Sequence, residues 1–325
     1  MTNSAEMTCN ICNNPKKNQV FQVREMMYGT REKFTYFECS QCGCLQILNV
    51  PRELASYYPS DYYSFEGTSP YDSMRQYLKT RGDRYAFFGT GLIGKLVCAR
   101  YPNDMLKRIA LTRTASDSRI LDVGCGFGGL VFSLRNLGFK KVLGIDPFVG
   151  REFIRDDIRI MRKTIHDLPD GESFDLILFN HSLEHIPDQL ETLSKVSRIL
   201  ADDGVCVVRI PVKTETVWKM YGVDWVQIDA PRHLFIHTVA SFRHLTERAG
   251  LQIESVLFDS TEFLFCGSDL YKKDIPLTAK ALRGLNPLNY FYSQRQIRQF
   301  RKMAGELNRT NQGDQATFSL ARNGG

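Results

Sequence analysis

Three glycines and two carboxylates around residues 120–146 have the types and spacing needed to hold a nucleoside. A largely apolar run, residues 120–123, leads into Gly124, Gly126 and Gly128, and a second apolar run ends at Asp146. Glycines let the backbone approach a ligand closely, and an acid at the end of the following strand can accept hydrogen bonds from ribose hydroxyls. The pattern therefore predicts a βαβ unit that binds a nucleoside.

The charge beside the glycines indicates which nucleoside. A dinucleotide site uses G-x-G-x-x-G spacing and places a pyrophosphate at a helix N-terminus. Here the spacing is G-x-G-x-G, and Asp122 lies two residues before the first glycine. S-adenosylmethionine (SAM) has no phosphate, but its cationic sulfonium and α-amino group favour a nearby carboxylate. Asp122 therefore favours SAM over NAD.

Four cysteines near the N-terminus have the spacing of a metal site. Cys9 and Cys12 form one C-x-x-C knuckle, Cys39 and Cys42 form another, and 26 residues separate the two knuckles. Four thiolates suit tetrahedral zinc, and a closed four-sulfur site leaves no position for catalysis, so the zinc would be structural. Residues 20–23 and 34–38 alternate in polarity, which predicts a hairpin between the knuckles. Cys44 is an alternative to Cys42 as the fourth ligand.

Polar residues follow a predicted buried strand, residues 173–180, where ligands of open α/β sheets bind. His181, Glu184 and His185 lie at i, i+3 and i+4. Three uses stay open: one histidine is a general base, the cluster holds a divalent cation that activates a hydroxyl, or the side chains only fix the loop. His233, in the polar stretch 229–237, is a further candidate base with an equally plausible structural role. The candidate catalytic residues are His181, His185 and His233, with His181 favoured because it directly follows Asn180.

The elements that must position these residues can be traced along the chain. Around the glycine loop we expect a helix over 130–137, strands over 142–145 and 173–180, a helix over 189–200, a turn at Asp203–Gly204, a strand over 205–210 and a helix over 241–249. Residues 73–112 predict helices broken near residues 89–91 and Pro102. Four consecutive segments follow: a zinc-binding module (1–60), a helical connector or lid (61–115), a SAM-binding domain (116–260), and a final strand with a basic helical extension (261–325).

Several motifs together resemble the class I SAM-dependent methyltransferases. LDVGCGFG (121–128) is similar to their first motif and GIDPF (144–148) to their acidic second one; FDLILFNHSLEHIPD (174–188) and RILADDGVCVVRIP (198–211) are similar to their fourth and fifth strands. The resemblance implies a Rossmann-like α/β fold with helices on both faces of the sheet, plus a small zinc-ribbon-like module in front. The residues expected to contact SAM are Asp122, Gly124, Cys125, Gly126, Asp146, Pro147, Ile165, His166 and Asn180.

Two further resemblances bear on the acceptor. The P-R-H-L-F segment (231–235) is similar to zinc-headed methyltransferases encoded with surface-polysaccharide and modified-sugar enzymes, which implies O-methylation of a nucleotide sugar or of a glycan that is lipid-linked in some cases. Residues 181–185 resemble ubiquinone-pathway and small-RNA 2′-O-methyltransferases, whose Glu-x-x-Glu-His cluster binds metal. This implies Mg²⁺ at His181, Glu184 and His185, although His181 departs from the pattern.

Composition leaves two alternatives and sets the compartment. From residue 271 onward ten Lys/Arg face three Asp/Glu, which suits an anionic partner and keeps an RNA methyltransferase with a zinc head as the first alternative. A non-catalytic SAM-binding scaffold is the second. Nine cysteines, the lack of an 18-residue apolar stretch and the lack of a signal-peptide pattern predict a cytoplasmic protein. Oligomeric state is left open.

Five aromatic residues within 57–65 are expected to pack the zinc module onto the main domain, with the lining of an acceptor pocket as the alternative.

Overall fold

The computed structural model describes residues 7–58, 73–155, 158–278 and 290–323. By their contacts the residues form two units, each built from separated stretches of chain. The first, here called the cysteine unit, contains Met1–Tyr57, Glu184–Leu190 and Arg209–Phe318; the second, the glycine-loop unit, contains Tyr58–Leu183, Glu191–Val208 and Ser319–Gly325. The division into four consecutive segments expected from the sequence stays a prediction.

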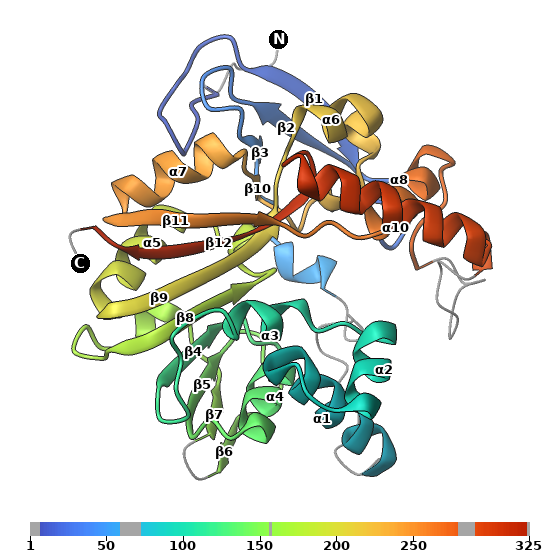
Figure 1. Cartoon of the computed structure of the whole chain (residues 1–325). Helices are drawn as coiled ribbons and strands as arrows, with labels where there is room; N and C mark the ends of the chain where they lie inside the picture. Colours follow the sequence, from blue (N-terminus) through green and yellow to red (C-terminus); the bar gives the residue numbers. More distant parts are fainter. Residues whose placement is uncertain (1–6, 59–72, 156–157, 279–289, 324–325) are drawn as a thin grey trace. The chain divides into compact units, whose positions relative to one another are not determined.

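A largely parallel sheet forms the centre of the glycine-loop unit (Figure 1). Within this unit its strands lie in the order β9-β8-β4-β5-β7-β6, and the second half of β12 (Gln315–Arg322) lies beside β9. Strands β8, β4, β5 and β7 run parallel, and β6 pairs antiparallel with β7 at the edge. The bounds are β4 Arg119–Val123, β5 Lys141–Ile145, β6 Phe153–Arg155, β7 Ile158–Met161, β8 Phe174–Asn180 and β9 Leu200–Pro211.

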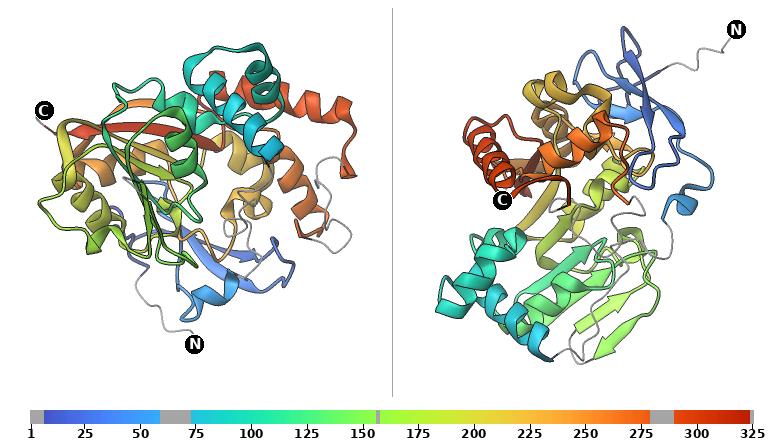
Figure 2. Two further views of the ribbon diagram at one scale, coloured as in Figure 1. Left: turned by 90° about the horizontal axis from the view of Figure 1, so that it is seen from below. Right: turned by 90° about the vertical axis from the view of Figure 1, so that its right-hand side faces the viewer.

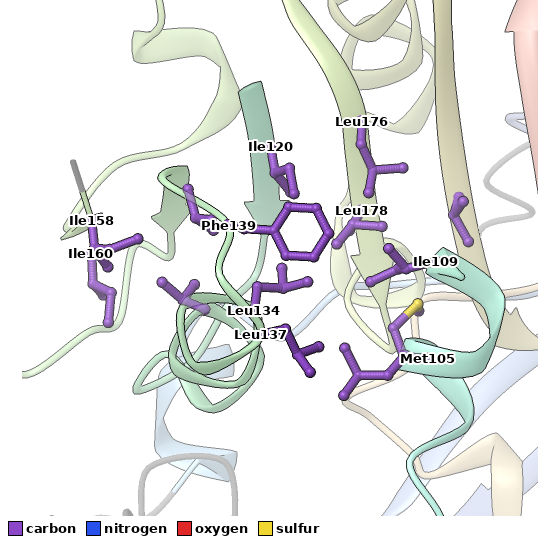
Figure 3. Packing of buried hydrophobic residues seen from close by; sticks show 14 of the residues in the cluster. Met105, Ile109, Ile120, Leu134, Leu137, Phe139, Ile158, Ile160, Leu176 and Leu178 are labelled. Carbon is purple, nitrogen blue, oxygen red and sulfur yellow. The ribbon is translucent and has the colours of Figure 1, made fainter. Parts of the chain in front are cut away.

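Helices pack around this sheet and enclose an apolar core. They are α1 Ser73–Phe88, α3 Asp104–Ile109, α4 Gly129–Leu137 and α5 Gln189–Ile199, and α2 Leu92–Arg100 packs on α1. The short 3-10 turn η2 Ile165–Asp167 belongs to the same unit, whereas η3 Leu183–His185 begins in it and continues into the stretch assigned to the cysteine unit. Figure 3 shows side chains of α3 and α4 packing against β4, β7 and β8. Ile109 of α3 and Leu134 of α4, for example, belong to the same buried cluster as Leu178 of β8. In β8 the successive apolar residues Leu176 to Phe179 are all buried, as a parallel strand covered on both faces requires, whereas β7 alternates buried Ile158 and Ile160 with exposed Arg159.

A four-stranded antiparallel sheet, in the order β1-β2-β3-β10, characterises the cysteine unit. β1 (Gln19–Arg24), β2 (Lys33–Glu38) and β3 (Leu45–Ile47) are consecutive, but β10 (Phe235–Ile236) comes from far along the chain and pairs with β3. Figure 2 gives two further views of the chain. The unit also holds η1 Leu54–Tyr57, α6 Glu215–Tyr221, η4 Gly222–Asp224, η5 Val226–Ile228, α7 Val239–Arg248, β11 Leu251–Phe258, α8 Phe263–Lys272, α10 Gln294–Arg309 and the first half of β12 Gln315–Arg322.

Most expected elements are present, and one is wrong. The hairpin between the cysteine knuckles is observed as β1 and β2, and residues 73–112 form helices that break at the expected places. The predicted turn at Asp203–Gly204 is wrong, because β9 runs without interruption from Leu200 to Pro211. Arg322 donates hydrogen bonds to the Leu200 carbonyl and to the Asp202 carboxylate, so pairing with distant residues overrides the local turn preference.

Two expectations concern segments of special composition. Most of the aromatic stretch 57–65 lies outside the described residues, so its role in packing stays a prediction. Among the described helices, none is both long and apolar enough to cross a membrane.

Candidate functional site

The glycine loop after β4 depends on glycine for both its conformation and its packing. Gly124, Gly126 and Gly128 have φ angles of 76°, 55° and 87°, in the left-handed region that favours glycine. A Cβ atom on Gly124 would lie 2.3 Å from the Cβ of Ser182, and one on Gly128 would lie 2.0 Å from the Cδ1 of Ile160. Ser182 and Ile160 can therefore approach the loop closely because Gly124 and Gly128 have no side chains at these two positions.

Asp146, directly after β5, is fixed by the same loop. One oxygen of its carboxylate accepts a hydrogen bond from the Gly126 amide at 3.0 Å, and the other accepts from the Phe148 amide at 2.8 Å. The side chain is 8% exposed. Each carboxylate oxygen has a second lone pair, so the group can accept ribose hydroxyls without moving.

Asp122 is a buried acid within the sheet. It is 3% exposed, and burial, followed by the negative charge of Asp146, raises the pKa of its carboxyl to about 7. A buried carboxylate of this kind gains from a nearby positive charge. The sulfonium and α-amino groups of SAM supply such a charge.

The end of β8 presents a buried acceptor. Among the described residues the Oδ1 atom of Asn180 is buried and has no hydrogen-bond partner. Two residues later, Ser182 Oγ donates to the Val123 carbonyl at 2.6 Å, which joins the ends of β8 and β4. Because a buried acceptor without a donor is costly, a ligand that supplies a donor is favoured here. The glycine cradle, the two acids and this amide fit SAM.

The other residues expected to contact SAM also belong to the glycine-loop unit, in different surroundings. Cys125 donates its amide to the Ile145 carbonyl at 3.1 Å, and burial raises the pKa of its thiol. Pro147 is exposed. In η2, Ile165 is buried, whereas His166 is exposed and places Nε2 3.3 Å from the Thr192 hydroxyl.

An aromatic side chain beside Asp146 was missed from the sequence. Phe148 is 56% exposed, and its ring stacks on Tyr58 with the ring centres 6.0 Å apart. An exposed ring of this kind offers a face on which a purine can stack. The only signal in the sequence was its position two residues after the predicted ribose-binding acid.

The four knuckle cysteines come together in the cysteine unit. The sulfur atoms of Cys9, Cys12, Cys39 and Cys42 all lie within 4.8 Å of one another, with Cys9–Cys42 at 3.6 Å and Cys12–Cys39 at 3.4 Å. Tetrahedral zinc with thiolate bonds of about 2.3 Å requires sulfurs about 3.8 Å apart. The hydrogen bond with the Cys42 thiol lowers the pKa of Cys9 to about 4. Burial alone would raise this pKa, and backbone amides of the knuckle lower it further. The arrangement fits a zinc ion.

Cys44 lies apart from this group. It is fully buried, and its sulfur is 4.0 Å from Nδ1 of His237. The His237 ring is itself held by Ser241 and Gln189 at 3.1 and 2.7 Å. Burial lowers the pKa of His237 to about 3, so it is a neutral structural histidine.

A second polar cluster, here called the histidine cluster, joins Glu184, His185 and His233. One potential metal-ligand atom from each lies within 4.8 Å of the others. The rings of His185 and His233 are 4.8 Å apart, and His233 Nε2 is 4.0 Å from Glu184 Oε1. The cation site expected from sequence contained His181, but in the described residues the grouped ligand is His233. His181 belongs to the glycine-loop unit and has a left-handed φ of 54°.

Hydrogen bonds fix the tautomers of both rings. Nδ1 of His185 lies 2.9 Å from the Arg232 carbonyl, and Nδ1 of His233 lies 2.7 Å from the Gln227 carbonyl. Because a carbonyl only accepts, each Nδ1 carries a proton, and in the neutral form of either ring the lone pair lies on Nε2. Burial, followed by the neighbouring His233, lowers the pKa of His185. The cluster can therefore accept a proton or bind a metal ion through Nε2.

A buried ion network supports this cluster. The fully buried guanidinium of Arg232 bonds Asp229 through two nitrogens, at 2.9 and 2.6 Å, and Glu25 at 2.8 Å. Burial tends to raise the pKa of Asp229, but the Arg232 charge outweighs it, and the pKa is lowered. Tyr36 donates its hydroxyl to the His233 carbonyl at 2.8 Å. No sequence pattern links Glu25 and Tyr36 to residues about 200 positions later.

Comparisons with known proteins agree with the loop chemistry. A family model described as a methyltransferase domain matches residues 97–256. The chain is similar to a tRNA U34 carboxymethyltransferase of Aeromonas salmonicida (29% identical over 147 residues, 40% of this chain and 43% of the relative). It is also similar to a ubiquinone biosynthesis O-methyltransferase of Rhodopseudomonas palustris (27% over 132 residues, 36% of this chain and 50% of the relative). The matches span half or less of these relatives.

Solved structures give similarities at low identity. One is the complex between the Haloferax volcanii Trm112 methyltransferase activator and the putative methyltransferase (TM-score 0.47, 19% identity, 74% of this chain and 97% of that chain). Another is an S-adenosylmethionine dependent methyltransferase from Mesorhizobium loti (TM-score 0.43, 19% identity, 68% of this chain and 99% of that chain).

Proposed function

We propose that this chain is a class I, SAM-dependent methyltransferase that transfers the methyl group of SAM to a hydroxyl oxygen of a sugar; a family model described as a methyltransferase domain matches residues 97–256. The observation that carries the proposal is the glycine loop between two buried acids, Asp122 and Asp146, beside the buried acceptor of Asn180. When bound, SAM supplies an electrophilic methyl group. The chain's own residues bind it, orient it and receive a proton.

A hydroxyl is a weak nucleophile, so a base supports the proposal. Removal of its proton during transfer contributes roughly 10²–10⁴-fold. His185 and His233 suit this role because their Nδ1 atoms donate to carbonyls and leave Nε2 as the acceptor. His181, which follows Asn180 directly, is the third candidate. Transfer also needs the acceptor oxygen in line with the methyl group, so positioning supplies much of the rate.

A divalent cation is the competing use of the histidine cluster. Two imidazoles and one carboxylate, from His185, His233 and Glu184, are a common set of transition-metal ligands. A cation there would activate the hydroxyl in place of a base. Loss of turnover in EDTA, restored by Mg²⁺ or Mn²⁺ but not by zinc alone, would select this use.

We assign the four-cysteine cluster a structural zinc that holds the segment carrying His233. Beyond the cluster, β3 pairs with β10, and Thr238 donates its hydroxyl to the Cys42 carbonyl at 2.8 Å. Tyr36 and Glu25 of the same module contact the His233 carbonyl and Arg232. The module thus acts on the reaction through the position of His233.

RNA is the second candidate acceptor. The relatives named for tRNA U34 favour it, as do the exposed Arg295, Arg298 and Arg309 of α10. Cations alone do not distinguish RNA from another polyanion. The identity of the methylated product therefore decides whether the acceptor is a sugar or RNA.

The decisive experiment incubates the purified chain with SAM and either a panel of nucleotide sugars and glycans or transfer RNA. Mass spectrometry should find one added methyl on a sugar, and the ¹³C chemical shift of a methyl labelled from SAM should place it on oxygen. Methylation of RNA alone would replace the sugar proposal. SAM binding without any product, across both panels, would instead favour the non-catalytic scaffold.

Histidine substitutions test the base. His185→Ala or His233→Ala should lower turnover by roughly 10²–10⁴-fold while SAM affinity stays nearly constant. His244→Ala, which removes an exposed histidine of α7, is the matched control. If His185, His233 and His181 variants all retain wild-type turnover, histidine is not the base. If SAM affinity and melting temperature fall together with turnover, the histidine is structural.

A further inference from the structure

The hairpin of α1 and α2 in the glycine-loop unit exposes several large apolar side chains where the two helices meet in sequence. In α2, Leu92 is 83% exposed, Ile93 51% and Leu96 74%. At the end of α1, Phe88 is 48% exposed. These four side chains lie within nine residues of one another and form what we call the hairpin tip.

The inner face of the hairpin is made by small residues instead. A Cβ on Gly94 would lie 2.3 Å from the Arg81 carbonyl oxygen, and one on Gly82 would lie 2.9 Å from a methyl of Val97. Glycines therefore bring the two helices close together. A helix pair of a soluble protein normally buries its leucines and exposes its polar residues. Here the pairing is complete without the leucines, which remain outside.

Cations surround the apolar tip. Residues 73–112 contain eight Lys or Arg and two Asp, and both acids are engaged, Asp83 by Lys79 and Asp104 by Lys107. Among the described residues no acidic partner is found for Arg81, Arg84, Lys95 or Arg100. The guanidinium of Arg84 lies over the Phe88 ring at 5.5 Å. The surface thus combines exposed leucines with cations that have no acidic partner among the described residues.

We propose that the α1–α2 hairpin docks on the surface of an anionic lipid bilayer. The boundary between headgroups and acyl chains offers anionic phosphates and apolar depth together, which matches the mixture of cations and leucines. A nucleic acid would match the cations but not the leucines. The nine-residue α2 is only about 13 Å long, too short to span a bilayer but long enough to lie in the interface.

This surface is separate from the glycine loop in sequence, and its test needs no acceptor. The proposal therefore does not depend on the proposed function. If both hold, the hairpin brings the enzyme to acceptors that are presented at a membrane.

The test measures co-sedimentation of the full chain with two kinds of vesicle. One is phosphatidylcholine alone, and the other contains roughly one-third phosphatidylglycerol. The wild-type chain should bind the anionic vesicles, and added salt should weaken binding. The double variant Leu92→Ser/Leu96→Ser should bind at least about tenfold more weakly. Lys95→Gln should lose about fivefold on anionic vesicles.

Two control variants change exposed residues of the same unit far from the hairpin in sequence. Ile154→Ser removes a side chain that is 63% exposed, and Arg159→Gln removes an exposed charge. Both should bind vesicles as the wild type does. Melting temperature and SAM affinity, measured for every variant, confirm that each chain is folded.

Three results would overturn the proposal. The first is no binding of the wild-type chain to anionic vesicles. The second is equal loss of binding in the hairpin and control variants. The third is a change of oligomeric state, seen by sedimentation velocity in the double variant without a change in vesicle binding, which would make the tip a contact between copies of the chain.

Discussion

The affinity for SAM should depend on pH through Asp122. In the SAM-free protein burial raises the pKa of this carboxyl to about 7 from an ordinary value of 3.8. If the cationic ligand binds the ionised form, it must displace the proton below that pH. About 1% of the carboxyl is ionised at about pH 5 and about half at about pH 7, so affinity should rise about fiftyfold between them. The α-amino group of SAM stays protonated over this range.

Calorimetry in buffers of different ionisation enthalpy measures both quantities. Near about pH 6, close to one proton should leave per SAM bound. Asp122→Asn should bind SAM more weakly, with an affinity that is flat with pH and without proton release. Wild-type affinity that is constant over this range, with no proton released, would refute the reasoning that SAM binds beside an ionised Asp122.

The same shift has a consequence for stability, with a defined sign. Because the folded pKa is raised, the group costs nothing when protonated below about pH 4, and the folded state loses stability as pH rises toward about 7. A shift of about three units gives an upper limit of about 4 kcal/mol. Asp122→Asn should therefore raise the melting temperature of the SAM-free protein at about pH 8 and leave it unchanged at about pH 4. The opposite order would contradict the assigned burial.

Three further predictions concern packing, charge and metal. Elemental analysis should find about one zinc per chain, lost in Cys42→Ser and kept in Cys44→Ser; the reverse result would exchange the two ligands. Gly124→Ala should destabilise the fold by roughly 1–3 kcal/mol, and adding Ser182→Gly should restore part of the melting temperature; a wild-type melt would contradict the contact. Arg232→Met leaves the buried Glu25 and the partly buried Asp229 without their cation and should cost about 3–5 kcal/mol in denaturant unfolding, whereas a loss below about 1 kcal/mol would disprove a buried network.

Local chemistry is what the sequence alone determined. The left-handed glycines, the acid at the end of β5 and the C-x-x-C knuckles each act through neighbours in the chain, so their types and spacing carry the information. The same holds for the breaks between α1, α2 and α3, which follow glycine and proline. These signals were sufficient for the α/β fold, the left-handed glycine loop after β4 and the hairpin between the knuckles.

Only the tertiary structure decided which distant residues meet. It selected Cys42 over Cys44 as a neighbour of the other knuckle sulfurs, and it replaced His181 by His233 beside Glu184. The strand through Asp203–Gly204 and the burial of Glu25 against Arg232 likewise depend on partners remote in the chain. Such pairings have no period or spacing in the sequence, because a buried charge or an extra strand is stabilised by whatever folding brings beside it.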